Sequence, residues 1–132
     1  MAGIENWMID EVVGVPGVLH VVVTTSDGIV TARSGEISRD NADRLGAMCA
    51  GLYAIGQNIA DAYGDGTGII HQNMIRFGGG FLFVRRAADG SRLAVVTSQA
   101  VDPAIIGQQM GKQVQKIGDK LSAAPRHPSP AA

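Results

Sequence analysis

Residues 69–97 read IIHQNMIRFGGGFLFVRRAADGSRLAVVT, and their pattern gives the strongest indication of the architecture. Three runs rich in β-branched and aromatic residues are separated by the glycine turns Gly78-Gly79-Gly80 and Asp89-Gly90. This alternation is typical of a three-strand antiparallel meander. The expected strands are Ile69–Phe77, Phe81–Arg86 and Arg92–Thr97.

The chain on either side of the meander supplies two more strands and three helices. Two β-branched runs joined by a turn predict strands at Val18–Thr25 and Ile29–Ser34. Apolar residues at helical spacing predict helices over Ile4–Val13, over Ser38–Tyr63, and from Asp102-Pro103 to Leu121. The element order is therefore αββαβββα in one domain of residues 1–121, and the Ala, Pro and Ser content of residues 122–132 predicts a disordered tail.

Strand composition predicts the order of the sheet. The first, fourth and fifth strands carry apolar residues at both alternating positions, as central strands do, whereas the second and third are mixed, as edge strands are. Hairpin adjacency then gives a five-stranded antiparallel sheet of order 2-1-5-4-3 with helices on both faces, an α+β fold. The third strand is a long unprotected edge, so we expect it to pair with a second copy of the chain. The alternative is that a loop or the tail covers it.

Composition excludes several classes of protein. The chain has 132 residues, 45% of them apolar, and a net charge of −1 without a basic cluster, which excludes a nucleic-acid binder. Its one cysteine excludes an intramolecular disulfide framework and a cysteine-rich zinc site. No apolar run is as long as a membrane span, and the acidic start lacks the layout of a signal peptide. We therefore expect a cytoplasmic protein without direct membrane insertion, which would reach the membrane only as a peripheral protein through partners.

Residues that could carry chemistry are few. His20, His71 and His127 lack the spacing of metal ligands, and Cys49 has no base near it in the sequence, so we expect no catalytic, metal or cofactor site. The glycine-rich segment Gly64–Gly68 could cradle an anion through its backbone amides. It follows a helix and precedes a strand, however, the reverse of a phosphate-binding turn, so we expect a connector.

The helix expected over Ser38–Tyr63 carries three stripes when it is wound at about 100° per residue. The large apolar stripe is expected to lie on the sheet: Leu45, Met48, Leu52, Ile55 and Ile59. A stripe of small residues favours a close contact between the helices of two subunits, the alternative being that its glycines relieve crowding against the chain's own sheet. With the third strand it forms the expected dimer interface: Ala42, Gly46, Cys49, Ala50, Tyr53, Gly56, Ala60, Ile70, Gln72 and Met74. We expect Gly46→Leu to weaken this dimer and to leave the subunit fold largely intact.

The element order and four stretches resemble the roadblock/dynein light chain family over Ile4–Leu121. The stretches are Val15-Pro16-Gly17-Val18, Thr25-Ser26-Asp27-Gly28, Asn41-Ala42-Asp43-Arg44-Leu45 and Gly79-Gly80-Phe81-Leu82-Phe83-Val84. The likeness is to the small bacterial members of the MglB type and to those encoded beside Ras-like GTPases in actinobacterial operons. It implies a profilin-like roadblock domain that forms a homodimer through the long helix and the third strand.

The resemblance also implies a non-enzymatic function. The homodimer would be a regulator or scaffold that binds a small Ras-like GTPase and modulates its nucleotide cycle. The alternatives are a structural adaptor in a membrane-associated sensor complex without effect on GTP turnover, with a membrane sensor kinase complex reached through the GTPase, and a small-molecule sensor with a closed apolar pocket. Carried over by position, the partner-binding surface is the open face of the long helix: Asp40, Asp43, Arg44, Ala47, Gly51, Ala54, Asn58 and Asp61.

Overall fold

The computed structural model describes residues 9–123 and confirms the element order expected from the sequence. The elements are α1 (Asp10–Val13), β1 (Val18–Thr24), β2 (Val30–Arg33), α2 (Arg39–Tyr63), β3 (Gln72–Phe77), β4 (Gly80–Arg86), β5 (Arg92–Ser98) and α3 (Pro103–Ala123). The first part of the helix expected over Ile4–Val13 lies outside the described residues, as does the tail from residue 124. Helix α3 extends to Ala123, two residues past the expected end of the domain at residue 121.

The five strands form one antiparallel sheet of order β2-β1-β5-β4-β3, which confirms the predicted topology. At its centre β1 pairs with β5, with Val21 opposite Val95 and Val22 opposite Ala94. All four side chains are fully buried, because helices cover both faces of the sheet there.

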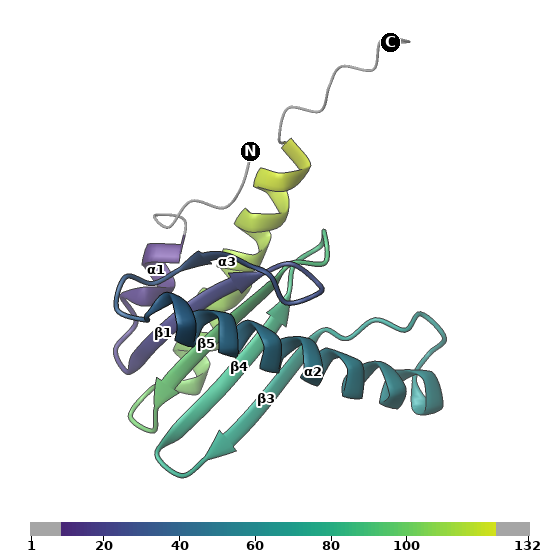
Figure 1. Ribbon diagram of the computed structural model, residues 1–132, viewed down its shortest axis with the longest axis horizontal. Coiled ribbons are helices and arrows are strands. Elements are labelled where there is room, and N and C mark those ends of the chain that lie inside the picture. Colours follow the sequence, from purple (N-terminus) through teal and green to yellow (C-terminus); the bar gives the residue numbers. More distant parts are fainter. Residues whose placement is uncertain (1–8, 124–132) are drawn as a thin grey trace.

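Helices cover the two faces unequally (Figure 1). On one face α1 and α3 enclose the larger core cluster, in which Ile9, Ile106 and Met110 pack on Val21, Leu93 and Val95. On the other face α2 lies alone and encloses a smaller cluster around Val22, Val84 and Ala94. The sheet thus has one face that two helices share and one that depends on α2.

Helix α2 begins at a capped end, because the Ser38 Oγ accepts a hydrogen bond from the Asn41 backbone N–H at 3.1 Å. Its buried residues all lie in its first half: Ala42, Leu45, Gly46 and Cys49. Figure 1 shows the reason, since the second half of α2 runs past β3 and beyond the edge of the sheet. The second half therefore has little of its own subunit beneath it.

The large apolar stripe of α2 does not lie on the sheet along its whole length, contrary to the expectation. Leu45 is buried and Leu52 packs on the smaller core cluster. Met48, Ile55 and Ile59, however, have exposed fractions of 59%, 60% and 58%. The expectation fails because α2 leaves the sheet edge and turns a different side toward the strands.

The small residues of α2 face the chain's own subunit instead. A Cβ built on Gly46 would lie 2.4 Å from the carbonyl oxygen of Gly28, in the turn between β1 and β2. Ala42 and Cys49 are buried in the smaller core cluster. At these positions the small residues therefore relieve crowding against the chain's own sheet, which was the alternative to a contact between two subunits. The helix backbone lies too close to the strands and their turn for larger side chains.

Strand β3 is shorter than the expected Ile69–Phe77, since it begins at Gln72. Ile70 packs instead against α2, where a Cβ on Gly56 would lie 3.3 Å from the Ile70 Cδ1 atom. The loop before β3 thus closes over one of the helix glycines before the chain enters the sheet.

Candidate partner-binding surfaces

The outer edge of β3 is open along its length. Among the described residues, no strand pairs with this edge. The Arg86 backbone N–H donates to the His71 carbonyl at 3.0 Å, and the ladder alternates from that pair. The backbone groups of Gln72, Met74 and Arg76 therefore point outward, where a further strand could bond to them.

A line of side chains, all exposed except the partly buried Leu52, follows the overhanging side of α2, and we call it the α2 flank. It consists of Arg44, Met48, Leu52, Ile55, Ile59 and Tyr63. Beside it, on the same face of the sheet, lie Ile75 and Phe77 of β3, with exposed fractions of 39% and 46%. Apolar side chains gathered in this way on a surface mark an interaction site.

The open face of α2 carries all the residues that the resemblance assigned to partner binding. Asp40, Asp43, Arg44, Ala47, Gly51, Ala54, Asn58 and Asp61 are all exposed. The middle of this face is flat, because its residues are Ala47, Gly51 and Ala54, and no described residue outside the adjoining turns of α2 comes within 4 Å of a Cβ built on Gly51. The face is available to a partner, and its use by one stays a prediction.

The residues expected in a dimer interface fall into three groups. Gln72 and Met74 are exposed on β3, whereas Ala50, Tyr53, Gly56, Ala60 and Ile70 are partly buried within the subunit. Ala42, Gly46 and Cys49 are buried, so a second subunit cannot pack on them while the fold is intact. A dimer stays a prediction, but these three residues cannot be its contacts.

Sequence reasoning missed the α2 flank as a surface, although the chain contains a signal for it. Met48, Leu52, Ile55 and Ile59 follow one another at spacings of four, three and four residues. That spacing suits a helix lying on a sheet, and it equally suits the contact line between two helices. The spacing alone does not distinguish the two.

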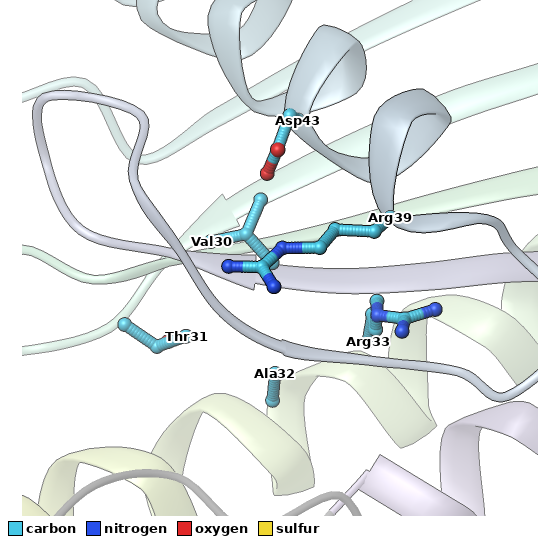
Figure 2. Close-up of a pocket in the computed structure, with 6 residues that line it drawn as sticks. All are labelled: Val30, Thr31, Ala32, Arg33, Arg39 and Asp43. Carbon is cyan, nitrogen blue, oxygen red and sulfur yellow. The ribbon is translucent and has the colours of Figure 1, made fainter.

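Two hollows adjoin α2. One, of about 240 Å³, lies over β2 and is lined by residues 30–33 together with Arg39 and Asp43 of α2. Figure 2 shows Arg39 reaching back over Val30, beneath the Asp43 carboxylate. The other, of about 370 Å³, lies between α2 and the sheet and includes His20, Arg44 and Met48.

Arg92 and Cys49, two ionisable residues where α2 meets the sheet, are buried within the subunit. Arg92 is buried under the helix with its guanidinium 4.2 Å from the centre of the Tyr53 ring, and it donates to the Gly90 carbonyl at 2.8 Å. Burial lowers the pKa of Arg92. Burial raises the pKa of the Cys49 thiol to about 11, so Cys49 is protonated at neutral pH and is a poor nucleophile.

The glycine-rich segment after α2 is tied by its own hydrogen bonds. Asp65 accepts from the backbone N–H and the hydroxyl of Thr67, at 3.0 and 2.7 Å, and these bonds lower the pKa of its carboxyl group. Gln57 donates to the Gly68 carbonyl at 2.9 Å. Because Asp65 and Gln57 bond the loop to itself and to α2, the segment fits the expected connector.

The histidines are dispersed: His20 lies in β1, His71 is exposed just before β3, and His127 is outside the described residues. Within residues 9–123, no cluster of three or more His, Cys, Asp or Glu is placed to hold a metal ion. In the same part of the chain, no helix combines the length and apolar composition that crossing a membrane requires.

Comparison with known proteins gives the family. Residues 5–97 match the model of the Roadblock/LC7 domain. The chain belongs to this family. A Roadblock/LC7 domain from Streptomyces avermitilis is 29% identical, with a TM-score of 0.82 over 89% of this chain and 98% of that one. Among curated proteins, none matches significantly.

Two more distant structures share the fold of this roadblock protein. The gliding protein MglB of Thermus thermophilus is 16% identical, with a TM-score of 0.79 over 89% of this chain and 88% of that one. Profilin IA of Acanthamoeba castellanii is 18% identical, with a TM-score of 0.58 over 87% of this chain and 97% of that one. The roadblock domain is therefore profilin-like in fold.

Proposed function

We propose that this roadblock protein is a non-enzymatic homodimer that binds a small Ras-like GTPase and modulates its nucleotide cycle. Membership of the Roadblock/LC7 family and the likeness in fold to MglB support a GTPase-associated regulator. The observation that carries the proposal is the open β3 edge beside the exposed apolar α2 flank, because together they give the subunit a surface that needs a partner.

The two features fit a two-fold dimer. An antiparallel pairing of β3 with β3 of a second copy would use the outward backbone groups of Gln72 and Met74 and extend the sheet across both subunits. The same pairing would bring the overhanging half of α2 over the second copy's sheet, where Ile75 and Phe77 are exposed. The dimer would thereby bury the apolar side chains that each subunit leaves in water.

The open faces of the two α2 helices then form the docking surface for the GTPase. Each is flat at Ala47, Gly51 and Ala54, and it carries carboxylates toward its ends, at Asp40 beside the cation Arg44 and at Asp61. A flat centre allows close approach of another backbone, and the carboxylates favour a partner with basic residues around its contact.

The test mixes the purified chain with the Ras-like GTPase encoded beside it, loaded with GDP or with a non-hydrolysable GTP analogue. We expect binding to at least one form and a changed rate of GTP hydrolysis or nucleotide exchange. Unchanged rates with intact binding would favour the adaptor function, in which the dimer serves a membrane-associated sensor complex. Absence of binding to both forms would refute the proposal.

A matched pair of variants locates the contact. Ala54→Arg places a charge at the centre of the open face of α2, whereas Gln108→Arg places one on the exposed side of α3, across the sheet. We expect Ala54→Arg to weaken GTPase binding by about tenfold or more, because enclosing an unpaired charge is costly, and Gln108→Arg to leave it unchanged. Equal effects of both variants would place the contact elsewhere.

A further inference from the structure

The hollow between α2 and the sheet is lined by a histidine that has a buried nitrogen atom without a partner. His20 projects from β1 into a lining that is otherwise mostly apolar, including Val96 and Met48. Its Nδ1 atom is buried and has no hydrogen-bond partner in the described part of the chain. A buried imidazole nitrogen left unbonded is unfavourable, so the hollow suits a group that brings a hydrogen bond with an apolar body.

The spacing of the residues in the α2 flank is the same in both directions along the helix. Its residues, from Arg44 to Tyr63, follow at spacings of four, four, three, four and four. In a two-fold interface, if one residue contacts a second residue of the other copy, then that second residue contacts the first one across the axis as well. The contact residues of an antiparallel helix pair therefore have a spacing that is symmetric about the axis. The α2 flank therefore matches itself when it is reversed.

The symmetric spacing of the α2 flank determines which side chains of the two copies lie next to each other. A two-fold axis midway between Leu52 and Ile55 places Met48 beside Ile59 of the second copy. It also places Arg44 beside Tyr63 of the second copy, since each lies about 14 Å from the axis at 1.5 Å per residue. Arg44 lines the hollow that holds His20, whereas Tyr63 is 87% exposed in its own subunit.

The two ends of the α2 flank are also electrostatically complementary. Arg44 presents a cation near the start of the helix. Tyr63 presents an aromatic face at the helix C-terminus, where the backbone carbonyls make the field negative, and the ionised Asp65 follows two residues later. Antiparallel pairing joins the cationic end of each helix to the electron-rich end of the other.

We propose that the hollow beside His20 is the socket for Tyr63 of a second copy. Because the Nδ1 atom is buried in the single subunit, the His20 ring turns about its Cβ–Cγ bond as the socket fills, and Nδ1 then accepts a hydrogen bond from the phenol hydroxyl. The Tyr63 ring lies against the guanidinium of Arg44, and each dimer holds two such sockets. The inference rests on the proposed homodimer and adds to it the register of the two helices and the group that completes the site.

Disulfide crosslinking tests the register. In the double variant Met48→Cys with Ile59→Cys, the two thiols of opposed subunits lie side by side, whereas within one chain they are about 16 Å apart, too far for a disulfide. Each single variant is the matched control, because its two symmetry-related cysteines are also about 16 Å apart. We expect covalent dimers from the double variant alone. Crosslinking by a single variant, or by none while sedimentation shows a dimer, overturns the register.

A double-mutant cycle tests the socket. Tyr63→Phe removes only the hydroxyl, and with two sockets we expect the dimer dissociation constant to rise about five- to 100-fold in sedimentation equilibrium. In a His20→Ala background, shown to be folded by circular dichroism, Tyr63→Phe should have little further effect. An unchanged dissociation constant for Tyr63→Phe overturns the socket and leaves the homodimer standing. A monomeric wild-type chain overturns the homodimer and the socket together.

Discussion

Gly46→Ala should destabilise the subunit itself. The added Cβ would lie 2.4 Å from the Gly28 carbonyl oxygen and 3.2 Å from the Val30 Cγ2 atom. The first distance is far below ordinary van der Waals contact, and the neighbour is backbone, so either α2 or the turn between β1 and β2 has to move. The change therefore acts within one chain, whatever its oligomeric state.

The change in the free energy of unfolding caused by Gly46→Ala follows from two opposed contributions. Alanine in a helix interior is favoured over glycine by about 1 kcal/mol, and overpacking of a close contact costs about 1–3 kcal/mol or more. Because the clash is with backbone, we expect the second term to win and the free energy of unfolding to fall by about 1–3 kcal/mol. At about 3–6 °C per kcal/mol for a domain of this size, Tm falls by about 3–18 °C.

The assay is thermal and urea unfolding at a fixed low protein concentration, followed by circular dichroism. Gly51→Ala is the matched control in the same helix, because no described residue outside the adjoining helical turns lies within 4 Å of the Cβ it would add. It should gain about 0.5–1 kcal/mol from helix propensity alone. If Gly46→Ala is as stable as Gly51→Ala, the close approach of α2 to the turn is not present in solution. The expectation that a larger residue at position 46 leaves the subunit intact is wrong on the same grounds.

Three further changes have defined outcomes. Ser38→Ala removes the acceptor for the Asn41 N–H and should lower the free energy of unfolding by about 0.5–2 kcal/mol in urea titrations, whereas an unchanged midpoint would show that the cap contributes nothing. Cys49, whose thiol has its pKa raised to about 11, should resist alkylation at pH 8 in the native protein and react once urea unfolds it; rapid native labelling would contradict its burial. Glu11 is paired with Lys116 on the surface, and the pair lowers the pKa of the Glu11 carboxyl group in the folded protein. Any stabilisation from this pair is present above the pKa that Glu11 has in the unfolded chain, and it is lost as the pH falls through the pKa of the folded state. Because the pair is exposed, Glu11→Gln should leave Tm at pH 7 unchanged, and a clear drop would show a larger role.

The sheet was predictable because its signals are local. Turn residues such as Asp89-Gly90 and runs of β-branched residues such as Val21–Val23 determine the hairpins, and apolar residues at both positions mark the central strands. None of these depends on how distant parts of the chain approach one another. The order β2-β1-β5-β4-β3 then follows from adjacency.

The orientation of α2 was not predictable in this way. Its two stripes, one large and one small, each suit a buried face, and periodicity does not say which one meets the sheet. The answer depends on the height of the helix above the turn at Gly28 and on how far it runs past β3, which are properties of the whole fold. The hollow at His20 could not be predicted from the sequence for the same reason, since residues of β1, β5 and α2 line it.

The overhang of α2 has a consequence for the lifetime of the protein in a cell. The helical turns around Ile59 and Tyr63 have few contacts within their own subunit, so they should open at a low cost in free energy. A copy without a partner would offer a protease an entry point there, which the proposed pairing of two copies would close. The abundance of the chain would then be limited by its own assembly, with surplus copies degraded from this helix onward.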